Sequence, residues 1–252
     1  MYRIVAVEYL NTLPYIRAIQ NSALLASKIE IVTADPKECA KALLTNSADL
    51  VLLPVGSFAD FDKLYMPLNF GIACYGKVYT VCIFSDKKWE DISIIRESVS
   101  SRSSNKLLEL LNHNFWNNSK QILDYNSIKE SDAMLIIGDE AFEAHQKFKY
   151  VYDLGEIWKQ NTGLPFVFAV WMSRKILDDS FIQLMDKAFE EGVKMDALIN
   201  LASGLEKNST ELISYFKSNI LFKLDEKMLE SLKLFFKLNK WNWNIEINAI
   251  NS

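Results

Sequence analysis

The sequence contains few of the residues that usually carry covalent or metal-dependent chemistry. Its 252 residues include two histidines, three cysteines, eight glycines and five prolines. The cysteines are odd in number, widely spaced and set in apolar surroundings, which argues against a disulfide framework and against a zinc site. His113 and His145 lie in polar, helix-like stretches, where we expect surface positions. A phosphate loop, a dinucleotide glycine fingerprint and a Ser-His-Asp set are also missing. Any reaction should therefore depend on positioning and on the substrate's own groups.

An excess of charge of one sign is missing too. The net charge is −4 and the charged residues are interspersed, so we expect neither nucleic acid nor a membrane as a partner. A small anionic ligand remains compatible with this balance, because two or three local donors suffice to bind it. The sequence lacks the ~18–20 continuous apolar residues of a membrane span. Its first seven residues resemble a strand and not a secretion leader, and we expect a cytoplasmic protein.

The first part of the chain alternates short apolar strands with helices. Strands are predicted at 3–8, 29–33 and 49–54, and helices at 13–20 and 36–44. This alternation predicts right-handed crossovers and a parallel sheet. Because ligands collect at the carboxyl ends of such strands, we expect Asn11 and the residues after Pro54 to share one rim.

A second alternating series follows an extended, glycine-containing stretch at 71–85, which we interpret as a hinge strand. The strand Phe166–Met172 is apolar enough to be buried on both faces. After it, only helices are predicted, at 181–201, 210–218 and 225–238. The pattern indicates two α/β lobes. Residues 1–82 and 169–252 are expected in the first lobe, residues 83–168 in the second, and a ligand cleft between them.

Two polar stretches are candidates for the ligand site. Asn11, in Tyr9-Leu10-Asn11-Thr12, can donate and accept hydrogen bonds without charge, so it could fix a hydroxyl or a carboxylate. Alternatively, Asn11 or Thr12 simply caps the following helix. Ser101-Arg102-Ser103-Ser104 leads into an apolar helix, predicted from about Asn105, and its hydroxyls, N–H groups and cation would suit a carboxylate. The alternative is a solvated loop with a serine cap.

Three further stretches carry weaker signals. Strand alternation along 77–81 places Thr80 and Val78 on one face, and Thr80 offers a hydroxyl, although threonine is ordinary in a strand. Gly138-Asp139 follows an apolar strand, where Asp139 could equally be a helix N-cap. The turn Thr162-Gly163-Leu164-Pro165 has more specified chemistry than a connecting loop needs.

Taken together, these motifs resemble the menaquinone-biosynthesis chorismate dehydratase family of the futalosine pathway. The matching segments are 9–14, 36–54, 76–81, 101–104, 136–139 and 162–171. The resemblance implies an α/β fold like the type II periplasmic binding proteins, with two lobes around a cleft and with C-terminal helices. It also implies that chorismate loses water to give 3-[(1-carboxyvinyl)oxy]benzoate, with no metal and no organic cofactor.

The resemblance implies catalytic roles for Asn11 and Thr80, while the substrate's own enolpyruvyl carboxylate could take the proton. Thr80 stands where the family usually has serine, and Lys77 where it has proline. The residues expected to bind substrate are Tyr9, Thr12, Arg102, Ser103, Ser104, Gly138, Asp139, Thr162 and Gly163.

Two alternatives remain open at this point. One is the sister enzyme that makes 1,4-dihydroxy-6-naphthoate, whose Pro-Asn-Asp opening and histidine base are missing from this sequence. The other is a solute-binding protein on the same fold, acting without catalysis in the cytoplasm. The oligomeric state is also left open.

Overall fold

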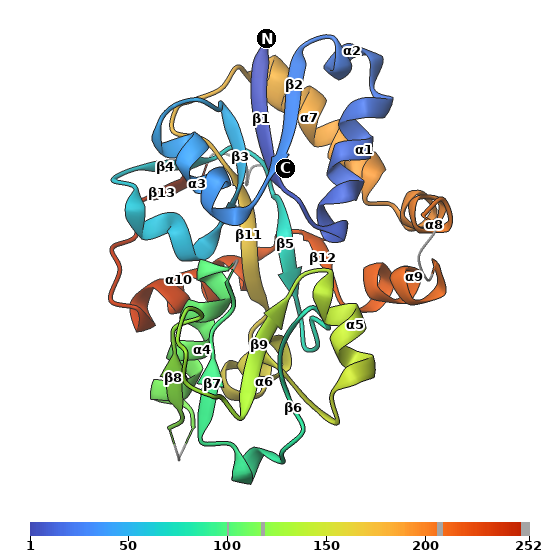
Figure 1. Cartoon of the computed structure of the whole chain (residues 1–252). Coiled ribbons are helices and arrows are strands. Elements are labelled where there is room, and N and C mark those ends of the chain that lie inside the picture. Colours follow the sequence, from blue (N-terminus) through green and yellow to red (C-terminus); the bar gives the residue numbers. More distant parts are fainter. Residues whose placement is uncertain (100, 117–118, 206–208, 248–252) are drawn as a thin grey trace.

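Two large sheets, one above the other, organise the molecule (Figure 1). The computed structural model describes residues 1–99, 101–116, 119–205 and 209–247. The larger sheet has the strand order β12-β5-β11-β3-β1-β2, the smaller one β10-β6-β9-β7-β8, and β13 and β4 form a separate pair. We call the larger sheet with its helices lobe 1 and the smaller sheet with its helices lobe 2.

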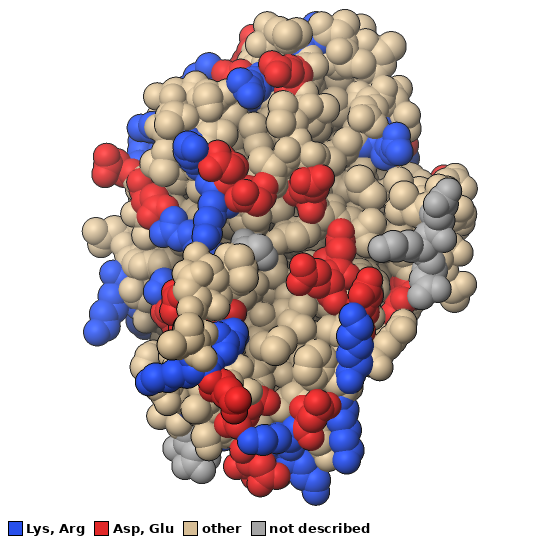
Figure 2. Space-filling model, in the orientation of Figure 1, with Lys and Arg blue, Asp and Glu red and all other residues tan. Residues whose placement is uncertain are grey.

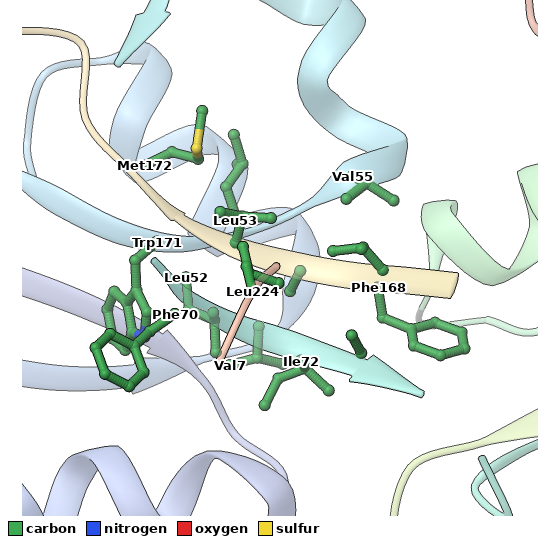
Figure 3. Packing of buried hydrophobic residues seen from close by; sticks show 14 of the residues in the cluster. Val7, Leu52, Leu53, Val55, Phe70, Ile72, Phe168, Trp171, Met172 and Leu224 are labelled. Atoms are coloured by element: carbon green, nitrogen blue, oxygen red, sulfur yellow. The ribbon is translucent and has the colours of Figure 1, made fainter. Parts of the chain in front are cut away.

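The strands of lobe 1 confirm the expected parallel beginning and the mixed sheet. They are β1 (Tyr2–Val7), β2 (Ile29–Ala34), β3 (Leu50–Pro54), β5 (Phe70–Cys74), β11 (Phe166–Met172) and β12 (Leu221–Lys223). β1 runs parallel to β2 and β3, whereas β11 runs antiparallel to both β3 and β5. Every residue of β11 is buried, as its apolar composition predicts. Figure 3 shows side chains of β3 and β5 packed around this strand.

Lobe 2 is smaller and also mixed. Its strands are β6 (Val81–Ser85), β7 (Ile94–Arg96), β8 (Gln121–Leu123), β9 (Ala133–Ile137) and β10 (Tyr150–Asp153). β7 pairs in parallel with β8 and β9, and β6 pairs antiparallel with β9 and β10. The separate pair consists of β4 (Leu64–Met66) and β13 (Ile245–Ile247), which lie parallel.

The helices pack around both sheets. They are α1 (Leu13–Asn21), α2 (Ala23–Ala26), α3 (Pro36–Leu44), α4 (Arg102–Asn114), α5 (Glu140–Lys147), α6 (Leu154–Thr162), α7 (Asp179–Gly192), α8 (Met195–Ser203), α9 (Ser209–Ser218) and α10 (Glu226–Leu238), with short 3₁₀ turns η1 (Leu10–Thr12), η2 (Val55–Asp60) and η3 (Trp89–Asp91). Local sequence explains several of their starts. The Asp35 carboxylate caps α3 by accepting from the N–H groups of Lys37 and Glu38, and Pro14 lies in the first turn of α1.

The chain passes between the sheets twice, between β5 and β6 and between α6 and β11. The proposed lobe boundaries at 82/83 and 168/169 fall inside β6 and β11. Val81 and Cys82 already pair with β9, and Phe166 and Val167 already pair with β5. Sheet pairing therefore moves the two changes of lobe to about 75–80 and 163–165.

The expected continuous hinge strand at 71–85 is wrong. β5 ends at Cys74, and the backbone then turns through Gly76 and Tyr79, whose φ angles of 100° and 70° lie in the left-handed region. The Asp153 carboxylate holds this turn by accepting from the N–H groups of Val78 and Tyr79. The strand alternation predicted for 77–81 is therefore lost.

The C-terminal part is not purely helical, which corrects a second expectation. The predicted helix at 181–201 breaks into α7, which ends at Gly192, and α8, which begins at Met195. Gly192 packs closely against α1, since a Cβ at this position would lie 2.6 Å from the Cβ of Ala18. β12 then returns to pair with β5 at the edge of the large sheet. Short strands such as β12 and β13 carry no periodic signal of their own, because each is only 3 residues long.

The surface carries both signs of charge. On the face in Figure 2, lysine and arginine are interspersed with aspartate and glutamate. Among the residues that the structure describes, no helix combines the length and the apolar character that crossing a membrane requires.

Candidate functional site

A pocket between the two lobes encloses about 540 Å³ of empty space, part of which is open to solvent. Lobe 1 contributes the ends of β1 and β3 and the middle of β11, and lobe 2 contributes the start of α4 and the end of β9. The polar side chains that line it are those of Tyr9, Asn11, Thr12, Thr80, Ser101, Ser103 and Ser104. Among the described residues lining the pocket, none carries a charged side chain. Asn11 and Pro54 both line it, but the residues that directly follow Pro54 do not, so the expected shared rim includes Pro54 and not the residues after it.

The side chains of Asn11 and Thr80 both form a hydrogen bond with Tyr215. The Asn11 Nδ2 atom donates to Tyr215 Oη at 3.2 Å, and Thr80 Oγ1 lies 3.0 Å from the same oxygen. Thr80 and Tyr215 are each 2% exposed. Burial raises the pKa of the Tyr215 phenol well above its usual value, against the opposing effect of its hydrogen bonds to Thr80 and Asn11. The phenol is therefore neutral throughout the ordinary pH range.

The alternative that Asn11 or Thr12 caps α1 is not what the structure shows. Thr12 occupies the N-cap position without a side-chain cap hydrogen bond. Its hydroxyl instead lies 3.4 Å from Asn11 Oδ1 and donates toward it. Both side chains are thus turned into the pocket and away from the helix end.

The start of α4 forms a second polar group in the pocket. The helix begins at Arg102, three residues earlier than predicted, so Ser103 and Ser104 are buried in its first turn and do not form a solvated loop. Ser101 Oγ accepts from the Ser104 N–H and donates to Ser104 Oγ at 2.9 Å. Ser103 Oγ donates to the Phe168 carbonyl and accepts from the Gly56 N–H. Among the described residues, only the Ser104 hydroxyl proton of these three lacks an acceptor.

Gly138 and Asp139 join the two lobes. Gly138 has a φ of 65°, and a Cβ there would lie 2.6 Å from the Tyr9 ring, so only glycine fits. The Asp139 carboxylate accepts from the Leu10 N–H at 3.1 Å. Asp139 does occupy the N-cap position of α5, as the alternative predicts, but its side chain makes no cap hydrogen bond there. Tyr9 and Gly138 line the pocket and Asp139 lies just outside its lining.

Three further predicted residues lie outside the lining of this pocket. The Arg102 guanidinium forms a bidentate ion pair with Asp60. Thr162 donates to the Trp158 carbonyl and accepts from the Leu164 N–H. Gly163, with a φ of 71°, is the left-handed C-cap of α6. The specific residue types of this turn thus serve to terminate α6 and to lead into β11.

Sequence reasoning missed Tyr215 and Asp153. Tyr215 lies on the buried face of α9, where an aromatic residue at helical spacing normally indicates core packing, so only its contacts show a polar role. Asp153 is 8% exposed, and burial raises the pKa of its carboxyl, against the hydrogen bonds from Tyr79, Glu156 and Val78. His145 is also more buried than expected, because it stacks on Tyr79 and bonds to its carbonyl at 2.8 Å.

Metal ligands are not assembled within the described ranges, where no three of His, Cys, Asp and Glu gather to hold an ion. The three cysteines are free and buried. Burial, together with the charge of Asp35, raises the pKa of the Cys39 thiol to about 12. These thiols are therefore poor nucleophiles and poor metal ligands at neutral pH.

Comparisons with known proteins find related sequences. A family model described as menaquinone biosynthesis matches residues 2–240. The chain is 26% identical over 243 residues to a chorismate dehydratase of Campylobacter jejuni, covering 93% of this chain and 96% of that protein. It is 26% identical over 186 residues to a chorismate dehydratase of Thermus thermophilus, covering 65% of this chain and 69% of that protein.

A solved structure confirms the expected fold. A Candida albicans protein with the generic periplasmic binding protein fold superposes with a TM-score of 0.67 at 11% identity, covering 100% of this chain and 98% of that chain. At this identity the likeness concerns the fold alone. The two-lobed, periplasmic-binding-protein-like α/β architecture is therefore established.

Proposed function

The chain belongs to the menaquinone biosynthesis family, and from that premise we propose that it is a chorismate dehydratase. Chorismate loses one ring proton and its ring hydroxyl as water and becomes 3-[(1-carboxyvinyl)oxy]benzoate, a step of the futalosine-dependent route to menaquinone. The atoms balance without an oxidant or reductant. Because the ring becomes aromatic, the driving force lies in the substrate, and the protein needs chiefly to position it.

The observation that carries the proposal is the meeting of Asn11 and Thr80 in one pocket. Asn11 belongs to lobe 1 and Thr80 to the turn that connects the lobes, yet both contact the same Tyr215 oxygen, at 3.2 and 3.0 Å. A single ligand in the pocket can therefore contact both. We assign the Asn11 amide and the Thr80 hydroxyl to the leaving hydroxyl and its neighbouring carboxylate, while the substrate's enolpyruvyl carboxylate takes the ring proton.

The first turn of α4 supports recognition of a carboxylate. The pocket lining carries no charged side chain among the described residues, so a helix start, with its unpaired N–H groups, supplies the positive potential. Ser104 is the hydroxyl in that turn with a proton to give, since Ser101 and Ser103 already donate elsewhere. We therefore propose Ser104 as the side-chain donor and Ser101 and Ser103 as the residues that fix the turn.

The sister enzyme's histidine base has no counterpart in this pocket. His113 is exposed on α4, and His145 bonds to the Tyr79 carbonyl. Neither of them lines the site. This arrangement favours dehydration of chorismate over the sister reaction.

Incubation of the purified chain with chorismate tests the proposal. Liquid chromatography with mass spectrometry should reveal a product lighter by one water that is absent from an enzyme-free control. Chorismate that is unchanged but raises the melting temperature would point instead to a binding protein, and either that result or no effect at all would contradict the dehydratase.

A substitution at Asn11 tests the residue assignment. Asn11→Ala removes an amide that contacts the reacting region, so kcat should fall by about 100-fold or more, with the fold retained by circular dichroism. Asn161→Ala is the matched control, because Asn161 is exposed and, among the described residues, its side chain bonds only to the Ile157 carbonyl of its own helix. Activity of Asn11→Ala equal to that of the control would remove Asn11 from the mechanism.

A further inference from the structure

Tyr215 connects the two proposed catalytic residues, although it belongs to a C-terminal helix that carries no motif. Its side chain is 2% exposed. Among the described residues, its hydroxyl has two hydrogen-bond partners, Asn11 Nδ2 and Thr80 Oγ1. A buried phenol with two polar partners forms a short chain of hydrogen bonds, and the direction of that chain follows from the chemistry of its ends.

The Asn11 amide determines which group donates in each of the two hydrogen bonds. An amide nitrogen donates and cannot accept, so Tyr215 Oη accepts from Asn11. The phenolic proton then has Thr80 Oγ1, at 3.0 Å, as its acceptor. If Thr80 donated to Tyr215 instead, the phenolic proton would be buried without a partner, which is costly. Thr80 therefore accepts, and its own hydroxyl proton remains available to the pocket that it lines.

The position of the phenol is fixed on several sides. Tyr79 Oη donates to Glu211 on α9 at 2.6 Å, and Asn219 beyond the helix end donates to the Lys77 carbonyl. The Tyr215 ring packs edge-on against Phe142, with the ring centroids 5.3 Å apart. Helix α9 is thus fastened to the turn that carries Thr80, one residue after Tyr79.

We infer that Tyr215 is a positioning residue, which orients the Thr80 hydroxyl as a hydrogen-bond donor to a ligand oxygen and holds the Asn11 amide beside it. For the reaction itself, this inference rests on the proposed dehydration of chorismate. Thr80 is then a donor to the departing hydroxyl or to a carboxylate oxygen, and it is not a base. Because burial keeps the phenol protonated, this orientation persists through neutral and mildly alkaline pH.

Tyr215→Phe removes the hydroxyl and keeps the packed ring. In chorismate turnover, kcat should fall by about 10- to 100-fold, because the Thr80 hydroxyl loses its orientation, while KM changes by less than about twofold. Tyr15→Phe is the matched control. Tyr15 is fully buried and its hydroxyl bonds to the carbonyls of Gly71 and Phe222, outside the pocket lining. This control should lose comparable melting temperature and keep its kcat. Equal kcat in the two variants would overturn the inference.

A second measurement does not depend on turnover. In the full-length protein with ¹³C-labelled tyrosine, proton NMR should detect a slowly exchanging Tyr215 hydroxyl proton that is close to the Thr80 side chain and is lost in Tyr215→Phe. In Thr80→Val this proton should shift, because its acceptor is removed. A hydroxyl proton unaffected by Thr80→Val would overturn the direction of the chain. If the wild type does not turn over chorismate but shows these NMR signals, the proposed function fails while the assigned geometry stands.

Discussion

In the proposed site, Thr80, Asn11 and Ser104 are uncharged hydrogen-bond donors, which suits a reaction whose driving force lies in the substrate. Each offers one hydrogen bond of defined direction, fixed by a neighbouring buried group. In the proposed reaction, such preorganised donors would stabilise developing charge. The proposed dehydration, which makes an aromatic ring, would require neither a histidine nor a cysteine at this position.

Arg102 provides a test at the residue scale, because the sequence favours a substrate contact whereas the structure shows an ion pair. Arg102→Met and Asp60→Asn both break the pair with Asp60. If the pair is the role of Arg102, both variants should raise the chorismate KM by the same small factor, less than about fivefold, since partly exposed ion pairs contribute about 0–1 kcal/mol. Steady-state kinetics measure this. A large rise in KM for Arg102→Met alone would restore the substrate contact.

At this scale the sequence identified most of the polar side chains that line the pocket. Asn11, Thr80 and the serines were predicted because their residue types suit the chemistry and their motifs are local. Tyr215 was not predicted, because its partners Asn11 and Thr80 are 204 and 135 residues away. A hydrogen bond over such a separation leaves no mark in the local pattern.

At the scale of elements, the turn between β5 and β6 matters most, because it carries Thr80. The sequence predicted an extended strand here, which its valine and tyrosine content favours. Tertiary contacts override that preference, since Asp153 at the end of β10 binds two successive N–H groups of the turn, at 3.1 and 2.8 Å. Asp153 also caps α6 through the Glu156 N–H. One carboxylate therefore fixes both the turn and a helix start.

Asp153→Asn tests this element. The substitution replaces one carboxylate oxygen, an acceptor, by an NH₂ group, a donor. This donor then faces a backbone N–H group, so the free energy of unfolding should fall by about 1–3 kcal/mol. Burial raises the folded-state pKa of Asp153 above its ordinary value of 3.8, so the folded protein holds this proton more tightly than the unfolded chain. The stabilising contribution of this titration is present below pH 3.8 and is lost as pH rises through the folded-state pKa.

Asparagine at position 153 has no carboxyl group to titrate, so the variant lacks this pH-dependent contribution to stability. The wild type's advantage over Asp153→Asn should consequently be larger at pH 4 than at pH 7, as measured by urea unfolding. An advantage that instead grows with pH would mean that the ionised carboxylate is the preferred form in the folded protein.

At the scale of the whole molecule, contacts between the lobes define a closed arrangement. Leu10 donates to Asp139, Gly56 donates to Ser103, and Arg102 pairs with Asp60, each contact joining lobe 1 to lobe 2. A Cβ at Gly56 would lie 2.5 Å from the Ser103 nitrogen, so the lobes touch at backbone distance there. These contacts hold the two lobes together around the pocket, part of which remains open to solvent.

Asp139→Ala tests whether these contacts maintain closure. Loss of the acceptor for the Leu10 N–H should favour an open form, raising the chorismate KM by about tenfold, in line with the 1.5–3 kcal/mol typical of a hydrogen bond to a charged group. Small-angle scattering of the ligand-free variant should show a larger radius of gyration. Asp139→Asn retains an acceptor oxygen and should lie between wild type and Asp139→Ala. An unchanged radius together with an unchanged KM would show that closure does not depend on this contact.

The sequence by itself determined the alternation of strands and helices in the first part of the chain, the apolar β11, and the polar residues at strand ends and helix starts. These features follow from hydrophobic period, capping residues and turn chemistry, which act over a few neighbouring residues. The tertiary structure alone decided the turn before Thr80, the breaks in the C-terminal helices, the ion pair of Arg102 and the place of Tyr215 between Asn11 and Thr80. Each of these depends on groups brought together from distant parts of the chain, where packing and burial outweigh local preference.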